Sequence, residues 1–305
     1  MIYYHDTTEF HIDGPCAVAL GKFDGIHRGH QKLIREILAY AKEHPGCKSA
    51  VFALNARDEQ LILTQDEQRE FLEAMGVDCL IQCPFVPEIY TMTAEEFVNR
   101  ILKDSLGTAF AAVGTDFRFG HHRAGDAAYL KEAGHRNGFE TGIVEHEMYH
   151  GQKISSTGVR DALLGGDVTT AEALLGRAYS IRGSVVRGAH LGTQIGIPTA
   201  NLIPPAGKLL PQRGVYVSET LLEGKVFRSV TDVGTKPTVD GSYEGAETFI
   251  FDLKEELYGK EIEVRLLEHI RKEMKFGGID ELIEQIRSDI RRGEEYFNGK
   301  RTVLS

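Results

Sequence analysis

The sequence lacks several features that mark special classes of protein. It contains no tryptophan and only four cysteines, and no apolar run approaches the roughly 18 residues of a membrane span. The spacing of Cys16, Cys47, Cys79 and Cys83 is irregular, which is not typical of a disulfide framework. Cys79 and Cys83 are spaced like half of a metal site, but no second Cys/His pair at matching spacing follows. We therefore predict reduced, partly buried thiols and a cytoplasmic location.

Positive charge is also in short supply. The chain has 35 Lys and Arg against 45 Asp and Glu, for a formal net charge of −10. This balance argues against a broad nucleic-acid-binding surface but is compatible with a local phosphate pocket. The N-terminus, Met1-Ile-Tyr-Tyr-His-Asp, has no basic start and no apolar core, so we expect no signal peptide. The expected partners are small molecules, with neither nucleic acid nor membrane, and the oligomeric state does not follow from the sequence.

The pattern of apolar residues changes along the chain. A length of 305 residues already suggests two domains. In the first half, short apolar runs alternate with segments of helical spacing, which is typical of a parallel sheet covered by helices. We expect strands at 17–20, 49–54, 78–82, 109–114 and 139–145, and helices at about 29–44, 66–75, 93–103 and 126–135. In such sheets, ligands bind beyond the carboxyl ends of the strands.

After about Gly176 the expected strands are short and separated by glycine-rich turns. They lie at 179–187, 214–222, 225–233, 248–253 and 261–266, and a helix follows at 280–292. Such spacing indicates an antiparallel sandwich or barrel. We predict an α/β domain with a Rossmann-like parallel sheet over residues 1–178, and a small antiparallel β-barrel domain with a C-terminal helix over residues 179–305.

The first motif, Gly21-Lys-Phe-Asp-Gly-Ile-His-Arg-Gly-His30, lies where the first strand gives way to the first helix. A helix start offers free N–H groups and a positive dipole end to phosphates, and glycines let a ligand approach the backbone. His27 and His30 add two donors, which can be cationic, and one turn can aim both at a triphosphate. A zinc pair is the alternative, but zinc needs three or four protein ligands, and His121 and His122 are the only obvious further candidates. We assign catalytic roles to both histidines and ATP or phosphate binding to Gly21, Phe23, Asp24 and Gly29.

The second motif, Ile154-Ser-Ser-Thr-Gly-Val-Arg160, places three hydroxyls before a helix and an arginine in its first turn. Ser155, Ser156 and Thr157 are either helix N-caps or a second phosphate cradle, and the two roles can coexist. In the cradle, the Arg160 guanidinium is a fork-shaped phosphate donor.

The third motif, Val113-Gly-Thr-Asp-Phe-Arg-Phe-Gly120, leaves another strand end. Asp116 is placed there to accept a hydrogen bond from an adenine or a ribose. For Phe117 and Phe119, packing that anchors the loop is the favoured interpretation over a functional role.

A glycine-rich segment in the second half ends in polar residues. Gly188, Gly192 and Gly196 suit a flexible loop over phosphates, and Thr199 and Asn201 follow Pro198. Their side chains supply the hard oxygens that Mg²⁺ prefers, so we assign both to a metal site. A plain glycine-rich turn is the alternative, and this pattern taken alone favours it.

The three first-half motifs, in this order, resemble the FMN adenylyltransferase module of the prokaryotic bifunctional riboflavin kinase/FAD synthetase family. The first two also resemble the wider nucleotidylyltransferase superfamily. The second half is similar to the riboflavin kinase module of the same family, a small antiparallel barrel. The segments that match it are Pro198-Thr-Ala-Asn201, Glu247-Thr-Phe, Leu257-Tyr-Gly-Lys and Ile270-Arg-Lys-Glu-Met-Lys-Phe276. The resemblance runs from about Ala17 to Asp289.

This resemblance implies a nucleotidylyltransferase-like first domain that adenylylates FMN with ATP to give FAD, and a second domain that phosphorylates riboflavin to FMN with ATP. It implies that Glu247 is a catalytic carboxylate, that Arg271 binds the flavin and that Asn55 contacts the nucleotide. Mg²⁺ is the implied cofactor, with ATP, FMN, riboflavin and FAD as substrates or products.

Several positions depart from the family pattern. The usual T-F-x-P-H-P reads Val51-Phe-Ala-Leu-Asn-Ala56, with Asn55 at the histidine position. In the kinase half, Thr193, Asp232 and Phe249 replace the usual Arg, Asn and His. Losing the Arg removes a phosphate donor, and Asp232 adds a charge that repels phosphate. The alternatives are therefore an FAD synthetase with an impaired kinase-like domain, or a non-catalytic flavin-binding protein.

Overall fold

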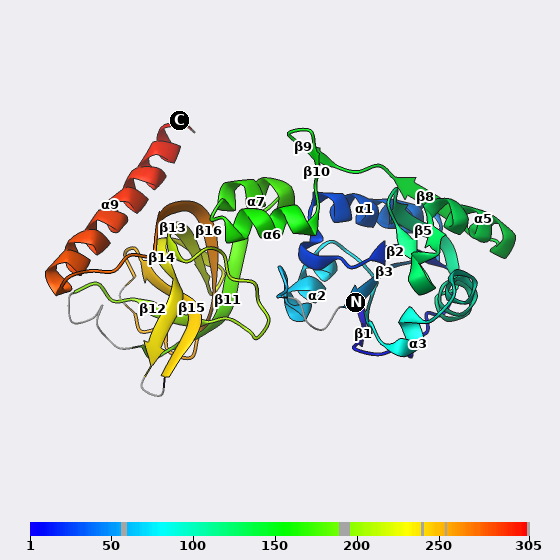
Figure 1. The fold of residues 1–305 in the computed structure, drawn as a ribbon, viewed down its shortest axis with the longest axis horizontal. Helices are drawn as coiled ribbons and strands as arrows, with labels where there is room; N and C mark the ends of the chain where they lie inside the picture. The colour runs from blue at the N-terminus through cyan, green and yellow to red at the C-terminus, as the bar shows by residue number, and fades with distance from the viewer. Residues whose placement is uncertain (56–59, 189–195, 239–240, 254, 304–305) are drawn as a thin grey trace. The chain divides into compact units, whose positions relative to one another are not determined.

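The computed structural model describes residues 1–55, 60–188, 196–238, 241–253 and 255–303. The chain separates into two compact units, Met1–Ser156 and Thr157–Ser305 (Figure 1). A parallel sheet with helices forms the first unit, and a closed antiparallel barrel with a C-terminal helix forms the second, which confirms the predicted fold class. Residues 157–178, which the sequence suggested for the first domain, are grouped with the barrel. The domain limits at 178/179 remain a prediction.

The first unit alternates strands and helices, largely where the periodicity predicts them. Its main strands are β1 (Ile2–His5), β2 (Cys16–Gly21), β3 (Lys48–Asn55), β4 (Cys79–Pro84), β5 (Thr108–Gly114) and β8 (Glu140–Val144). Its helices are α1 (Arg28–Glu43), α2 (Gln65–Ala74), α3 (Pro87–Tyr90), α4 (Ala94–Glu96), the π-helix η2 (Phe97–Ser105) and α5 (Ala127–Asn137). Short elements complete it: η1 (Asp24–Ile26), β6 (Arg118–Phe119), η3 (His121–Arg123), β7 (Gly125–Asp126), β9 (Met148–Tyr149) and β10 (Gln152–Lys153).

The six strands of the sheet are parallel and lie in the order β1-β4-β3-β2-β5-β8. From β2 the chain adds β3 and β4 on one side, and it then returns to add β5 and β8 on the other. The carboxyl ends of β2 and β5 are therefore neighbours at the point where the strand order reverses, and open α/β sheets bind ligands at that point.

Both faces of the sheet are covered by helices, and its central strands β2 and β3 contain continuous apolar runs at 16–20 and 50–54. Along β2, Ala17 and Ala19 belong to a core that includes Ile34 and Ile37 of α1. Val18 belongs to the opposite core, which includes residues of η2 and α5. This double burial explains why the sequence shows continuous apolar runs here rather than alternation.

The second unit begins with two helices and continues as a barrel. Helices α6 (Ser156–Leu164), whose first residue closes the first unit, and α7 (Val168–Leu175) precede the strands. The strands are β11 (Tyr179–Val186), β12 (Ala200–Ile203), β13 (Gly214–Leu222), β14 (Lys225–Thr238), β15 (Gly241–Ile250) and β16 (Glu261–Lys272). They close in the order β11-β12-β15-β14-β13-β16, and α9 (Ile279–Val303) ends the chain.

The barrel carries α9 on one apolar surface. Ile290 and Phe297 of this helix pack with Val217, Val230 and Phe251 of the barrel. Helix α7 packs against β11 and β16. The sequence missed β1, β12 and α7, because segments of four to eight residues are too short to show a clear period, and it ended the last helix too early.

Candidate functional site

The turn between β2 and α1 has a strained backbone. Phe23 and Ile26 adopt left-handed φ angles of 53° and 40°, and Gly25 between them has φ of 79°. A left-handed non-glycine residue costs on the order of 1–3 kcal/mol, and such strain persists only where the surroundings enforce it. The Phe23 and Ile26 side chains are fully buried in the core beneath α1, which offsets this cost.

Three side chains donate hydrogen bonds to carbonyl groups of this turn. Gln68 Nε2 donates to Phe23 O at 3.1 Å, Ser156 Oγ to Asp24 O at 2.9 Å, and Gln31 Nε2 to Ile26 O at 2.9 Å. Gln82 Nε2, in β4, donates in turn to Gln68 Oε1 at 2.7 Å, and both glutamines are buried. The turn is therefore fixed by bonds from three separate segments of the chain, which pre-organises it for a ligand.

His27 and His30 lie together at the start of α1. His27 is the N-cap of the helix, and its Nδ1 accepts from the His30 backbone N–H at 3.3 Å. Their rings are stacked, with centroids 3.7 Å apart. Gly29 lies close to this pair, since a Cβ there would lie 3.2 Å from the His27 ring. A Cβ at Gly21 would similarly lie 3.3 Å from the Phe23 ring.

The environment of His30 determines its protonation. Burial lowers its pKa well below the usual 6.5, and His27 and Lys153 lower it further. The sequence allowed for a cation here, but at neutral pH His30 is an uncharged donor. Its buried Nδ1 makes no hydrogen bond to any residue that the structure describes. An unsatisfied buried nitrogen of this kind is suited to receive a ligand atom.

The first two motifs meet at this turn. The Ile154 carbonyl lies 3.9 Å from the position of a Cβ on Gly29, and Ser156 bonds to Asp24 as described above. Ser155 directly precedes α6, while Thr157 and Arg160 follow within it and belong to the second unit. Within the described part of the chain, no cluster of three or more His, Cys, Asp or Glu residues could hold a metal ion.

Asp116 of the third motif follows β5, at the same edge of the sheet. It forms an ion pair with Lys153 and lies 3.6 Å from His146 Nε2, which is also 3.0 Å from Thr115 Oγ1. Burial raises the pKa of Asp116, but the hydrogen bond and charge of Lys153, with His146, outweigh it and lower the pKa below its ordinary value. Asp116 is thus held as a carboxylate acceptor. Its role toward adenine or ribose stays a prediction.

The other residues singled out in the first half of the sequence lie in the core, except that the side chain of Asn55 is not described. Phe119 is buried in the sheet core, and Phe117 stacks on it with ring centroids 5.5 Å apart, in line with the packing role predicted for both. Asn55 ends β3 opposite Pro84, but its side chain lies outside the described residues. All four cysteines are free and buried, and burial raises the pKa of Cys79 and Cys83 to about 12.

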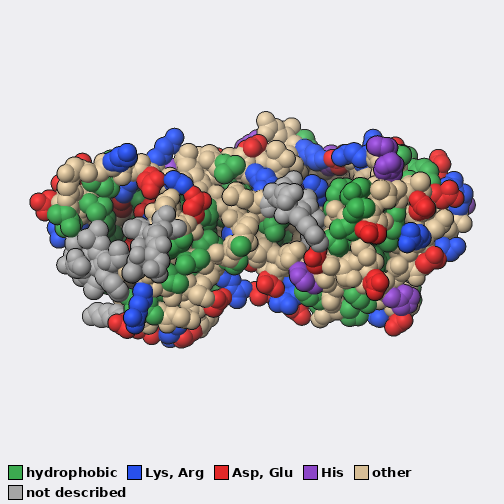
Figure 2. Space-filling view, turned by 60° about the horizontal axis from the view of Figure 1, so that its bottom comes forward, with side chains coloured by type: hydrophobic (Ala, Val, Ile, Leu, Met, Phe, Trp, Pro, Cys, Tyr) green, Lys and Arg blue, Asp and Glu red, His purple; other side chains and the backbone are tan. Residues whose placement is uncertain are grey.

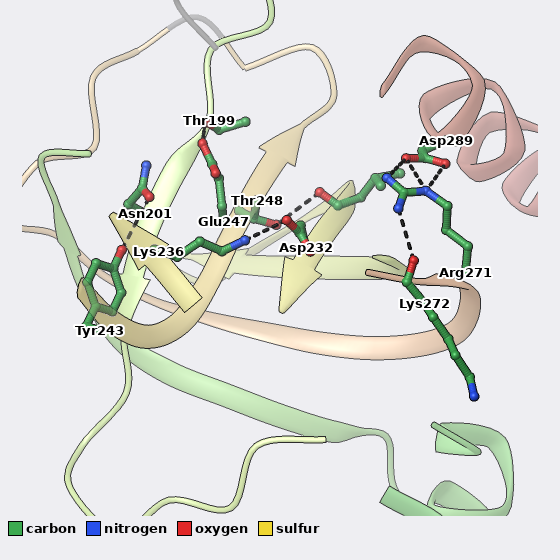
Figure 3. A network of polar contacts seen from close by, with 11 residues as sticks. Thr199, Asn201, Asp232, Lys236, Tyr243, Glu247, Thr248, Arg271, Lys272 and Asp289 are labelled. Atoms are coloured by element: carbon green, nitrogen blue, oxygen red, sulfur yellow. Dashed lines mark hydrogen bonds and ion pairs between the residues drawn. The ribbon is translucent and has the colours of Figure 1, made fainter. Parts of the chain in front are cut away.

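In the barrel, Asn201 and Glu247 lie on the adjacent strands β12 and β15, and Thr199 directly precedes β12 (Figure 3). Glu247 of β15 is the register partner of Asn201 on β12 and of Asp232 on β14. The Thr199 hydroxyl donates to Glu247 Oε1 at 2.5 Å. The structure therefore brings Thr199, Asn201 and Glu247 together and places Asp232 in the same row, while their roles stay predictions.

Two residues at this site were missed from the sequence. The Tyr243 hydroxyl donates to Asn201 Oδ1 at 3.3 Å, and burial, together with the charge of Glu247, raises the Tyr243 pKa to about 12. Lys236 Nζ lies 2.6 Å from Asp232 Oδ2. The sequence indicated Asp232 as an added negative charge without a partner, and the structure pairs it with Lys236. The alternating pattern of β14 could have revealed the pair, since residues four apart on a strand share a face.

Comparison with known proteins relates both sites to one family. The FAD synthetase family matches residues 9–158, and the riboflavin kinase family matches residues 175–297. A bifunctional riboflavin kinase/FMN adenylyltransferase from Escherichia coli (strain K12) is 36% identical over 292 residues, covering 92% of this chain and 93% of that protein. One from Haemophilus influenzae is 34% identical over 296 residues, covering 93% of this chain and 94% of that protein. The chain belongs to the bifunctional riboflavin kinase/FMN adenylyltransferase family.

A solved structure shares the fold of this family member. It is a protein of Streptococcus pneumoniae named as a macrolide-efflux protein, with 31% identity and a TM-score of 0.85. The match covers 96% of this chain and 98% of that one.

In the described part of this chain, no helix is long and apolar enough to cross a membrane. Acidic and basic side chains are intermixed on the face that Figure 2 shows.

Three further residues were singled out in the second half of the sequence, and two of them lie in the described part of the structure. Arg271 binds Asp289 of α9 through both Nε and a terminal nitrogen, the closest contact being 2.8 Å, so it anchors the helix to β16. Its flavin-binding role stays a prediction. Phe249 packs with the core between the barrel and α9, which accounts for an apolar residue there. Thr193 lies outside the described residues.

Proposed function

We propose that this protein makes FAD in two reactions, phosphorylating riboflavin to FMN in the barrel unit and adenylylating FMN in the parallel-sheet unit. The observation that carries the proposal is the stacked His27–His30 pair on a strained, fixed turn at the switch point of the sheet. Matches to the families of both activities within one chain support the pairing of the two reactions.

In adenylyl transfer, a phosphate oxygen of FMN bonds to the α-phosphorus of ATP, and the bond to the bridging oxygen breaks to release pyrophosphate. The protein's task is to position two anions and stabilise the charge between them. We assign His27 and His30 to the triphosphate and its leaving group. Residues of the second motif would hold the β- and γ-phosphates: Ser155, Ser156, Thr157 and Arg160. Gly21, Phe23, Asp24 and Gly29 would shape the ATP site, with Asn55 and Asp116 as further nucleotide contacts.

In the kinase reaction, Glu247 would orient the ribityl 5′-hydroxyl of riboflavin and accept its proton. The hydroxyl oxygen then bonds to the γ-phosphorus of ATP, and ADP leaves. The hydrogen bond from Thr199 fixes the carboxylate for this task. Arg271 is the proposed flavin contact, and it would act from its anchored position beside Asp289.

The residues of the barrel site fit Mg²⁺. Thr199 and Asn201 contribute a hydroxyl and an amide oxygen beside the Glu247 carboxylate, which are hard donors. Gly188 leaves room around this set, because a Cβ there would lie 2.4 Å from the Asn201 amide nitrogen. Thr199 and Asn201 would hold the ion, which supplies neutralisation of phosphate charge when bound.

A product analysis tests both reactions. Purified protein is incubated with ATP and Mg²⁺ and with either riboflavin or FMN, and the flavins are resolved by chromatography. We expect FMN and then FAD from riboflavin, and FAD from FMN. If FAD forms from FMN but riboflavin is not phosphorylated, the protein is an FAD synthetase without kinase activity. If neither flavin is converted, the alternative of a non-catalytic flavin-binding protein is favoured. We also propose that the adenylyltransferase domain comprises residues 1–178 and the kinase domain residues 179–305. We propose a cytoplasmic location for the protein.

A further inference from the structure

The barrel site places two carboxylates side by side. Asp232 and Glu247 are register partners on the antiparallel strands β14 and β15, so their side chains share one face. Like charges directly opposite each other destabilise a sheet, and here one of the pair is the proposed catalytic carboxylate. An ATP-binding site adds further negative charge at the same place. Some group must therefore balance the Asp232 charge.

Lys236 provides this balance from the same strand. Its Nζ lies 2.6 Å from Asp232 Oδ2, and the Lys236 side chain is only 6% exposed, against 42% for Asp232 (Figure 3). An ammonium that is withdrawn from water in this way is costly unless it is paired, so Lys236 depends on the Asp232 carboxylate. The pair differs in this respect from the more exposed ion pairs of the barrel, such as Arg265 with Glu263 at 2.9 Å.

We propose that Lys236 is a positioning residue for riboflavin phosphorylation, which acts by holding and neutralising the Asp232 carboxylate beside Glu247. This inference rests on the proposed kinase function of Glu247. The pair keeps Asp232 from competing with Glu247 for Thr199, Mg²⁺ or the riboflavin hydroxyl. Asp232 and Lys236 therefore act as one unit, and neutralising Asp232 alone lowers the kinase rate instead of raising it.

The test is a double-mutant cycle in the full-length protein, with Asp232→Asn, Lys236→Met and the double variant. Lys236→Met leaves Asp232 charged beside Glu247, and Asp232→Asn leaves a buried ammonium unpaired. Each single change should lower kinase kcat/KM by about tenfold, with the Lys236→Met loss partly in the KM for ATP. The double variant should recover to within about threefold of the wild type, since neither charge is then left alone. Lys236→Arg, which keeps the charge, should retain more activity than Lys236→Met.

Two control measurements make the result decisive. FAD formation from FMN, measured on the same preparations, should stay unchanged because it belongs to the other unit. Arg265→Met removes a charge from a more exposed pair of the same barrel and should leave the kinase rate unchanged. A rise in kinase activity on Asp232→Asn alone, or additive losses in the double variant, would overturn the inference while leaving the proposed function intact. Absence of kinase turnover in the wild type would overturn both the inference about Lys236 and the proposed kinase function.

Discussion

The β2–α1 turn of the first unit and the β12–β15–β14 row of the second carry charge in different ways. At the turn, the side chains proposed to bind phosphate include a neutral buried histidine, and the backbone is fixed by hydrogen bonds from glutamine and serine side chains. In the barrel row, a buried lysine pairs with one of two neighbouring carboxylates. Removing one side chain at the turn removes one hydrogen-bond donor, whereas removing one charge in the row leaves its oppositely charged partner unpaired. The following predictions separate these two behaviours.

The largest expected effect is in the barrel. Glu247→Gln removes the base and keeps the shape, so we expect riboflavin phosphorylation to fall by at least about 100-fold, within the range for general-base catalysis. FAD formation from FMN should be unchanged. Both rates are measured by chromatography of the flavin products. Retention of most kinase activity would show that another group accepts the riboflavin proton.

The matching change in the first unit is removal of a histidine. His27→Ala or His30→Ala should lower FAD formation more than tenfold, or by about 1.4 kcal/mol of transition-state stabilisation. The kinase rate should not change. His135→Ala, an exposed position near the end of α5, is the control. Near-normal FAD formation in both histidine variants would refute their assignment to the triphosphate.

The neutral state of His30 gives a dependence of stability on pH. Because burial, His27 and Lys153 hold its folded pKa well below 6.5, the unfolded chain binds more protons between the two pKa values. The contribution of His30 to stability is therefore complete above about pH 6.5 and declines as the pH falls toward the folded pKa, by at most about 1.4 kcal/mol per pH unit.

Denaturant unfolding of the wild type and His30→Gln at several pH values between 7.5 and 5 measures this decline. The variant should lose stability less steeply below pH 6.5, since glutamine does not titrate. Equal slopes for the two proteins would mean that His30 is protonated as readily in the folded state as in the unfolded state.

The sequence predicts the elements that have strong periods, and it predicts less well the contacts that join them. The helix at 93–103 was placed by the Thr93 cap, and Thr93 indeed forms a capping box with Glu96. The bond from Gln68 to Phe23 spans 45 positions and joins α2 to a turn, so no local pattern reveals it. Gln68 and Phe23 come together only in the folded protein. His27 and His30 are close in the sequence, so a sequence motif can identify them.

Local signals were also present and missed. Lys236 lies four residues from Asp232 on a strand whose alternation is visible in the sequence. The departure from the family pattern concerns Asp232 alone and carries no information about a partner on the same strand face. Helix α7 gave a weaker signal, because its short apolar pattern fits either neighbour. It packs against β11 and β16, and the domain limit at 178/179 stays a prediction.

The smallest expected effect concerns this division. A fragment of residues 1–178 retains Thr157 and Arg160 on α6 but removes β11 and β16, against which α7 packs. Val168, Ala171, Leu174 and Leu175 are buried in α7 and would be exposed, so the fragment should be less soluble while its sheet stays folded. A shorter fragment, 1–164, ends with α6 and omits these apolar residues, which makes it the matched control.

Both fragments should form FAD from FMN at a rate within about threefold of the full chain, equivalent to less than about 1 kcal/mol in activation free energy, because every residue assigned to adenylyl transfer is retained. Circular dichroism establishes that each fragment is folded, and chromatography of the product gives the rate. Two folded but inactive fragments would mean that the barrel unit contributes to adenylyl transfer, and the contrast drawn between two separate sites would fail. Activity in 1–164 but not in 1–178 would instead assign the loss to the exposed surface of α7.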